Sequence, residues 1–225
     1  MAAQGGMILK IHIVCFGDSN THGLCADPAD CADGGTRFNE NERWTQLLQK
    51  KLGDKYMIIE EGLSGRTTVF TDPLHEGMSA LDVAYPILMS HEPIDLLIIM
   101  LGSNDTKERF CVGAPGIALG MDRLIKKIKS IPCWSEKGPN ILMVSPAHIR
   151  EGMYTTKAAG TMGRGCAERS AELSRYLEPV AIANGCAFID AEGKTEVNQV
   201  DYVHLTRKGH AMLAESLAQV VPALL

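Results

Sequence analysis

The sequence predicts a three-layer α/β/α sandwich, in which helices cover both faces of a doubly wound parallel sheet of about five strands. Two observations support this fold class. Short apolar runs alternate along the chain with longer stretches whose apolar residues recur every three or four positions. The run from Leu96 to Leu101 is apolar at every position, which is typical of a strand buried on both faces of a parallel sheet. Because 225 residues fit one such core, we assign residues 1–225 to a single domain.

Five apolar runs are predicted to form the strands of this sheet. They cover residues 8–16, 56–59, 94–101, 141–145 and 187–189. Four helices are predicted between and after the strands. The first begins at Trp44 and ends before Gly53, a residue type that is common just after a helix. The others cover residues 117–128, 166–184 and 208–221.

Two segments have the length and polarity of binding loops. Residues 25–41 are rich in Asp, Gly and Ala, and residues 146–165 contain several glycines and polar side chains. Loops this long inside a compact domain often cover a binding site. A surface excursion without a function explains either segment nearly as well, so the sequence leaves both interpretations open.

The composition argues against several classes of protein. The formal net charge of −5 offers no basic face for a nucleic acid. No apolar run approaches the ~20 residues that a membrane-spanning helix needs. Residues 1–7 lack the basic start and apolar stretch of a signal peptide, so we expect a cytoplasmic protein. The seven cysteines are scattered without a CxxC pair, and we expect reduced packing residues rather than zinc ligands.

The candidate nucleophile is Ser19, in the segment FGDSN that directly follows the first predicted strand. A serine hydroxyl is a weak nucleophile unless a neighbouring base takes its proton. His204 can be that base, and Asp201 can fix the tautomer of its ring. Their spacing of three residues would place both side chains on one side of a helical turn, which we expect here. These three residues predict acyl transfer.

Two further segments follow predicted strand ends and complete the candidate site. Gly65 lies in GLSGR after the second strand, and Asn104 lies in GSND after the third. Ligands of open α/β sheets bind beyond the carboxyl ends of the strands, so these segments should converge with Ser19 on one crevice. The backbone N–H groups of Ser19 and Gly65 and the side-chain amide of Asn104 are predicted to form the oxyanion hole. Asp18 and Asp105 are expected to brace their loops as hydrogen-bond acceptors.

Each of these residues also has an ordinary structural interpretation. Ser19 by itself fits a helix N-cap, and Gly65 and Asn104 fit turns. Their joint occurrence, in this order, favours catalysis. Arg66 breaks the GxSxG pattern of an α/β-hydrolase nucleophile elbow and is expected to form a supporting salt bridge. His210 is expected to be a surface or packing histidine.

The four motifs resemble those of the SGNH hydrolases, the GDSL-type esterases and lipases. Ser19, Gly65, Asn104 and His204 match the four letters of that name, and Asp201 matches the acid. The blocks fall in the family's order and span nearly the whole chain. The resemblance implies an SGNH, flavodoxin-like fold and a serine esterase. Its mechanism needs no metal or organic cofactor.

Four longer segments resemble the arylesterase and acyltransferase branch of that family: residues 37–38, 43–45, 60–68 and 98–107. The branch implies hydrolysis of short-chain and aryl esters, with acyl transfer to alcohols or hydrogen peroxide in some members. It also implies a homo-oligomer that narrows the entrance to the site. Asn20 stands where the family commonly has leucine, and His22 where the branch often has an aromatic residue. Both are predicted to line the substrate pocket. Asn20 makes the pocket wall more polar, and the polarity of His22 favours hydrolysis over acyl transfer.

Three other functions fit parts of the sequence. Asp18, Asn104, Asp105 and His204 are residue types of a two-metal phosphoesterase, although the DxH and GNH[DE] motifs of that class are missing. A non-enzymatic module that binds carbohydrates or esters is the second alternative. A deacetylase of acetylated carbohydrates is the third, favoured by the polar pocket residues and by residues 25–41. We expect a small-molecule ester as the substrate, with no nucleic-acid or membrane partner.

Overall fold

The structure is a computed structural model and describes residues 9–225. Its five strands are all parallel and follow the order β2-β1-β3-β4-β5. They are β1 (Ile11–Gly17), β2 (Tyr56–Gly62), β3 (Leu96–Met100), β4 (Ile141–Ser145) and β5 (Ala187–Asp190). The residue-8 start predicted for the first strand, and the prediction about residues 1–7, lie outside the described residues.

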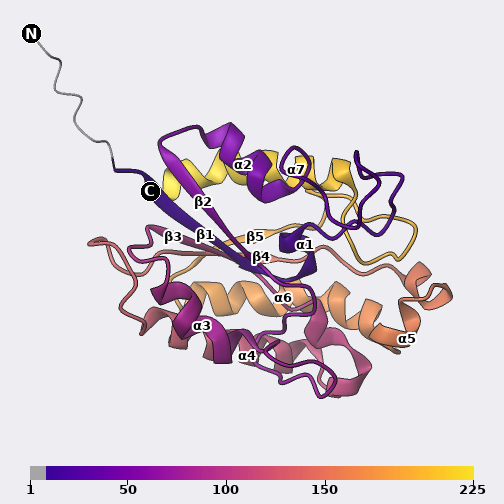
Figure 1. The fold of residues 1–225 in the computed structure, drawn as a ribbon. Coiled ribbons are helices and arrows are strands. Elements are labelled where there is room, and N and C mark those ends of the chain that lie inside the picture. Colours follow the sequence, from indigo (N-terminus) through magenta and orange to yellow (C-terminus); the bar gives the residue numbers. More distant parts are fainter. Residues whose placement is uncertain (1–8) are drawn as a thin grey trace, which may run out of the picture.

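Helices cover both faces of this sheet, which confirms the predicted fold class (Figure 1). One face carries α2 (Trp44–Leu52) and α7 (Arg207–Val220). The other carries α3 (Ala80–Met89), α4 (Ala114–Lys129) and α6 (Cys166–Ala183). Shorter elements are α1 (Ser19–His22), α5 (Ala159–Met162) and the 3₁₀ helices Asn104–Thr106, Glu108–Phe110, Glu151–Thr155 and Val221–Leu224. Among residues 9–225, no helix combines the length and the apolar character that crossing a membrane requires.

Two hydrophobic cores lie on the two faces of the sheet. Alternate residues of β1 enter different cores: Val14 and Phe16 pack with α3, α4 and α6, whereas Ile13 and Cys15 pack with α2 and α7. All five residues of β3 are buried, as the apolar run in the sequence predicts. Successive side chains of a strand point to opposite faces, so an unbroken apolar run is what a sheet covered on both faces requires.

Helix α3 is absent from the sequence prediction. It is ten residues long, and Pro86 lies inside it. Apolar residues occupy most of its positions, and this obscures the three-to-four periodicity that identifies a surface helix. The segment predicted as a loop at residues 146–165 also contains regular structure, because the 3₁₀ helix from Glu151 and helix α5 both lie in it.

The sheet positions the site through its strand order and through two glycines. The chain order reverses at β1, which pairs with β2 on one side and with β3 on the other. Ligands bind beyond the strand ends at such a switch point. Helix α1 is held tightly against this edge: a Cβ added to Gly62 would lie 2.2 Å from the backbone nitrogen of His22, and one added to Gly17 would lie 2.0 Å from the Thr21 hydroxyl. Only glycine allows this approach.

Candidate active site

Ser19 is the first residue of helix α1, and only Asp18 separates it from the end of β1. Asp18 caps this short helix, because its Oδ1 accepts a hydrogen bond from the backbone N–H of Asn20 at 3.0 Å. Ser19 therefore does not act as the N-cap itself. Its side chain is free to point toward the strand ends, and the residue is 7% exposed.

The structure brings Ser19, His204 and Asp201 together in one chain of hydrogen bonds. His204 Nε2 lies 2.8 Å from Ser19 Oγ, and His204 Nδ1 lies 2.6 Å from Asp201 Oδ2. Ser19 comes from the β1 end, and the other two come from the segment between β5 and α7. The arrangement has the geometry of a nucleophile, a base and an orienting acid.

The expectation that Asp201 and His204 share a helical turn is wrong. The segment is irregular, and Tyr202 has a φ of 61°, which is incompatible with a right-handed helical turn. A side-chain turn replaces the helix: Asp201 Oδ1 accepts from the N–H groups of Val203 and His204 at 2.9 and 3.0 Å. Asp and Asn side chains commonly bond their own backbone in this way, and such local bonds compete with helix formation.

Asn198, which the sequence analysis missed, holds the acid in place. Its Nδ2 donates to Asp201 Oδ1 at 2.8 Å and to the His204 carbonyl at 2.7 Å. Burial alone raises the pKa of Asp201, but the hydrogen bonds and the positive charge of the His204 ring outweigh burial and hold that pKa well below its usual range. The carboxylate therefore stays ionised as the acceptor for the Nδ1 proton. An Asn three residues before the acid was the available sequence signal.

The three predicted oxyanion donors, on Ser19, Gly65 and Asn104, belong to residues that line one cavity. Gly65 has a φ of 94°, a conformation that favours glycine. Asn104 begins a 3₁₀ helix after β3, and its Nδ2 lies 3.4 Å from Asp18 Oδ2. Asp18 thus braces two of the three segments, as expected. Burial raises the pKa of Asp18.

Asp105 and Arg66 stabilise the loops after β1 and β2 through hydrogen bonds. Asp105 is fully buried and accepts from the Thr68 N–H at 2.9 Å and from its hydroxyl at 2.5 Å. Burial raises the pKa of Asp105 to about 6. The salt bridge expected of Arg66 is replaced by bonds to backbone, because its guanidinium donates to the carbonyls of Gly17 and Glu61. Burial lowers the pKa of Arg66 to about 10.

The cavity in front of Ser19 measures about 320 Å³. Its lining residues are Ser19, Asn20, Leu24, Ser64, Gly65, His75, Met78, Ser103, Asn104, Lys107, Ala158, Thr161, Met162, Val203 and His204. Of the two segments predicted as binding loops, residues 146–165 contribute to the lining through Ala158, Thr161 and Met162, whereas no residue of the 25–41 segment is among the lining residues. Such loops often form binding sites on a rigid sheet.

The two predicted substrate-binding residues differ in position. Asn20 lines the cavity, but its side-chain amide already bonds to backbone on both sides of His204. His22 is not among the lining residues, so its expected place in the pocket wall is wrong. It lies on α1 and its carbonyl accepts from Arg37. Burial lowers the pKa of His22.

Two lining residues carry charge or polarity that the sequence analysis did not assign to the site. His75 lies on the segment between β2 and α3, and Lys107 follows Asn104 by three residues. Lys107 is only 4% exposed, and its Nζ lies 3.8 Å from Asp72 Oδ2. Burial lowers the pKa of Lys107. The spacing in GSNDTK was the available signal, because a 3₁₀ turn returns the chain to the same side after three residues.

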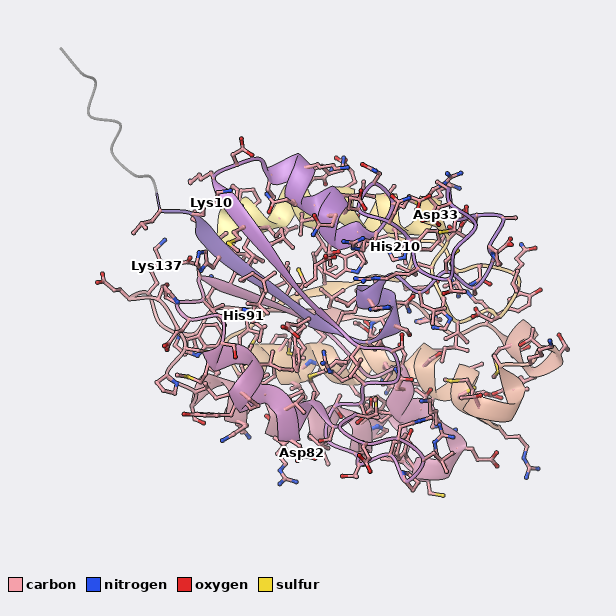
Figure 2. All side chains as sticks on the ribbon, in the orientation of Figure 1. Lys10, Asp33, Asp82, His91, Lys137 and His210 are labelled. Carbon is pink, nitrogen blue, oxygen red and sulfur yellow. The ribbon has the colours of Figure 1, made fainter. Side chains whose placement is uncertain are left out.

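His210 lies on α7, on the face of the sheet that α2 and α7 cover (Figure 2). His210 is fully buried, so of the two expected roles it has the packing one. Its Nδ1 accepts from the Trp44 N–H at 3.2 Å, and its ring meets that of Phe38 edge-on at 4.9 Å between centroids. Burial lowers the pKa of His210 to about 3.

Within residues 9–225, no group of three or more His, Cys, Asp or Glu side chains has the arrangement of a metal site. The seven cysteines are all free thiols, and five of them are buried. Burial raises the pKa of Cys25 to about 12, which is the behaviour of a packing thiol.

Comparisons with known proteins identify the family of this chain. The model of the GDSL-like lipase/acylhydrolase family matches residues 15–212. The aryl esterase of M. smegmatis is 32% identical, with a TM-score of 0.84 over 96% of this chain and 100% of that one. A carbohydrate acetylesterase from Sinorhizobium meliloti is 32% identical, with a TM-score of 0.85 over the same shares. A search of curated proteins finds no match. The chain belongs to the GDSL-like lipase/acylhydrolase family, the SGNH hydrolases, and is a carboxylic ester hydrolase.

Proposed function

We propose that this protein hydrolyses short-chain esters, acetyl esters above all, by a two-step acyl-enzyme mechanism at Ser19. One observation carries the proposal. Ser19 Oγ, the two nitrogens of the His204 ring and Asp201 Oδ2 form a continuous chain, with links of 2.8 and 2.6 Å, at the wall of a cavity that three oxyanion donors also line.

In the first step, Ser19 Oγ attacks the ester carbonyl carbon as its proton passes to His204 Nε2. The carbonyl oxygen becomes an oxyanion, which accepts hydrogen bonds from the N–H groups of Ser19 and Gly65 and from Asn104 Nδ2. Ionised Asp201 keeps the Nδ1 proton in place and stabilises the imidazolium. The ester C–O bond then breaks, and His204 gives its proton to the leaving alcohol.

In the second step, water replaces the alcohol. It loses a proton to His204 Nε2 while its oxygen attacks the acyl carbon, and the same three donors hold the second oxyanion. The second tetrahedral intermediate then breaks its bond to Ser19 Oγ, which releases the carboxylic acid, and His204 returns its proton to Ser19 Oγ. Acyl transfer is the same step with an alcohol or hydrogen peroxide in place of water.

The cavity supports a small acyl group. A volume of about 320 Å³ is at the lower end for small-molecule sites. Its apolar wall is formed by Leu24, Met78, Ala158 and Met162, side chains that suit a short alkyl or aryl group. The same cavity is also lined by the polar side chains of Ser64 and Ser103, and we propose hydrolysis as the main reaction with acyl transfer as a lesser activity.

The test compares initial rates on p-nitrophenyl acetate, butyrate and octanoate, for the wild type and Ser19→Ala. We expect the acetate to react fastest, the rate to fall with chain length, and the mutant to be inactive but folded by circular dichroism. A serine-directed phosphonate should inactivate the wild type and leave its adduct on Ser19 in the mass spectrum. Turnover in folded Ser19→Ala, or loss of activity only with a chelator, would remove the serine mechanism and favour a metal-dependent phosphoesterase.

A deacetylase of acetylated carbohydrates is the second candidate. The polar residues His75 and Lys107 in the cavity favour it, as does the likeness to a carbohydrate acetylesterase. Acetate release from acetylated xylan and acetyl sugars, measured against p-nitrophenyl acetate, distinguishes the two. A higher kcat/KM on the sugars would make carbohydrate the natural leaving group.

A further inference from the structure

Both ends of the side-chain amide of Asn20, next to the candidate nucleophile, bond to backbone groups. Its Oδ1 accepts from the Leu205 N–H at 3.0 Å, and its Nδ2 lies 3.5 Å from the Val203 carbonyl oxygen. The backbone of Asn20 is equally engaged: its N–H donates to Asp18 Oδ1 at 3.0 Å, and its carbonyl accepts from Trp44 Nε1 at 3.0 Å. The residue is 5% exposed.

Both partners of the Asn20 amide flank the candidate base. Val203 and Leu205 are the residues immediately before and after His204, so the amide forms hydrogen bonds with the backbone on either side of it. We call residues 201–205 the base loop and residues 18–22 the nucleophile turn. Across the part of the chain that the structure describes, the hydrogen bonds that join the two come from Asn20 and from the His204–Ser19 pair itself.

The other bonds that shape the base loop do not set its distance from Ser19. Asp201 and Asn198 bond to the loop's own backbone, and they would move with it. Arg150 donates its N–H to the Tyr202 carbonyl from the far side at 3.0 Å. Asn20 is therefore the side chain that fixes the loop relative to the nucleophile turn, and α2 in turn fixes Asn20 through Trp44.

We propose that Asn20 is a positioning residue, which holds His204 Nε2 within reach of Ser19 Oγ by tying the base loop to the nucleophile turn. This role replaces the substrate-binding role that the sequence predicts for Asn20, and it rests on the proposed serine mechanism. Both ends of this amide already bond to the backbone of the base loop, and only one N–H of Nδ2 and one lone pair of Oδ1 are left for any other contact. Proton transfer from Ser19 depends steeply on that geometry.

The test is Asn20→Leu, which removes both amide bonds and introduces the residue that the family commonly has at this position. We expect kcat on p-nitrophenyl acetate to fall by about 10- to 100-fold with KM within about twofold of the wild type. The rate of inactivation by the phosphonate should fall in parallel, because it also needs deprotonation of Ser19 by His204.

The matched control is Asn184→Leu. Asn184 also makes two side-chain bonds of 2.8 Å, to Asp122 and to the Val180 carbonyl, at the C-terminus of α6 and away from the cavity. The Asn184→Leu variant should be less stable than the wild type and have the same kcat. An equal kcat loss in the control would mean that general destabilisation explains the effect, and the proposal would fall.

Two other outcomes overturn the proposal. Unchanged kcat in folded Asn20→Leu shows that the base loop does not need the tie. A raised KM with unchanged kcat would show that Asn20 binds substrate, as the sequence predicts, and does not position His204. If Asn20→Leu does not fold, Asn20→Asp decides, since it keeps an acceptor for the Leu205 N–H but adds a negative charge beside His204. Loss of the bond to the Val203 carbonyl should lower kcat with little change in KM, and a kcat equal to that of the wild type contradicts the proposal.

These results separate the inference from the proposed function. If the wild type has no ester turnover and Ser19 takes no phosphonate, the serine mechanism itself fails. If the wild type reacts and Asn20→Leu reacts equally well, only the positioning role fails.

Discussion

Asp201 shows how single residues prepare this site. One oxygen accepts from the Val203 and His204 N–H groups and from Asn198, and the other faces the His204 ring. Three donors to Oδ1 leave that oxygen saturated, so the ring bond falls to Oδ2 alone. The orientation of the Asp201 carboxylate is thus set by groups that lie within three residues of it, two backbone N–H groups and the Asn198 amide.

At the same scale, Asn104→Ala tests the oxyanion hole. Removing a preorganised donor should lower kcat roughly 10²- to 10³-fold with little change in KM, because the donor serves the transition state more than the bound ester. Steady-state kinetics on p-nitrophenyl acetate measure this. The variant also leaves buried Asp18 Oδ2 without its 3.4 Å donor, so the melting temperature should fall. A loss smaller than fivefold in kcat would exclude Asn104 from the oxyanion hole.

Helix α1 illustrates control at the scale of elements. It is four residues long and cannot be stable by itself, so its place depends on what it touches. Asp18 caps it, Trp44 of α2 holds the Asn20 carbonyl, and the strand-end glycines let its backbone lie against β2. The position of Ser19 is therefore a property of three elements rather than of its own segment.

Gly62→Ala tests this packing. The new Cβ would lie 2.2 Å from His22 N and 2.5 Å from Thr21 C, both backbone atoms that cannot rotate away. Relief requires α1 to shift, and overpacking of this kind costs about 1–3 kcal/mol. Urea unfolding should show that loss, and kcat should fall because Ser19 moves with α1. Gly160→Ala is the control, since its Cβ would meet no heavy atom within 4 Å. Equal stability of the two variants would contradict the packing argument.

At the scale of the whole molecule, buried groups set how stability depends on pH. The folded-state pKa of His210 is about 3, whereas its ordinary value is 6.5. Between these values the unfolded chain binds a proton that the folded protein does not, so stability falls as pH drops from 6.5 toward 3. Asp201, whose pKa is lowered, adds a further loss that begins only below its ordinary value of 3.8.

His210→Gln isolates the first of these effects. Glutamine does not titrate and keeps an acceptor for the Trp44 N–H. At about pH 4.5 the wild type should have lost roughly 2–3 kcal/mol of unfolding free energy from this histidine alone, and the variant should lose less over the same range. Urea midpoints between pH 7 and 4.5 measure the difference. Parallel curves for the two proteins would mean that His210 is not buried in its neutral form.

Association of copies is a second property of the whole molecule, and we propose a homo-oligomer. Leu63 and Leu74 are exposed, at 39% and 65%, on segments that flank the cavity residues Gly65 and His75. Apolar side chains of this kind at a site entrance suit contact with another subunit. Analytical ultracentrifugation should give a mass that is a multiple of 24.4 kDa, and a purely monomeric species at micromolar concentration would refute it.

The sequence by itself determined the α/β fold, the five strands and the identity of the residues that meet at the strand ends. It could do so because these features are local: an apolar run reports a doubly covered strand, and a parallel sheet carries the ends of its strands to one edge. The strand predictions for residues 141–145 and 187–189 match β4 and β5 to within one residue. Helix α3 was not predicted because its apolar residues do not recur every three or four positions.

Only the tertiary structure decided how those residues work together. The tie from Asn20 to the base loop, the absence of His22 from the cavity wall and the presence of Lys107 in it depend on contacts between segments distant in sequence. Asn20 and Leu205 are separated by 185 positions. No local pattern records such a pair, because the energy of a buried hydrogen bond depends on which partner the fold brings within 3 Å of it.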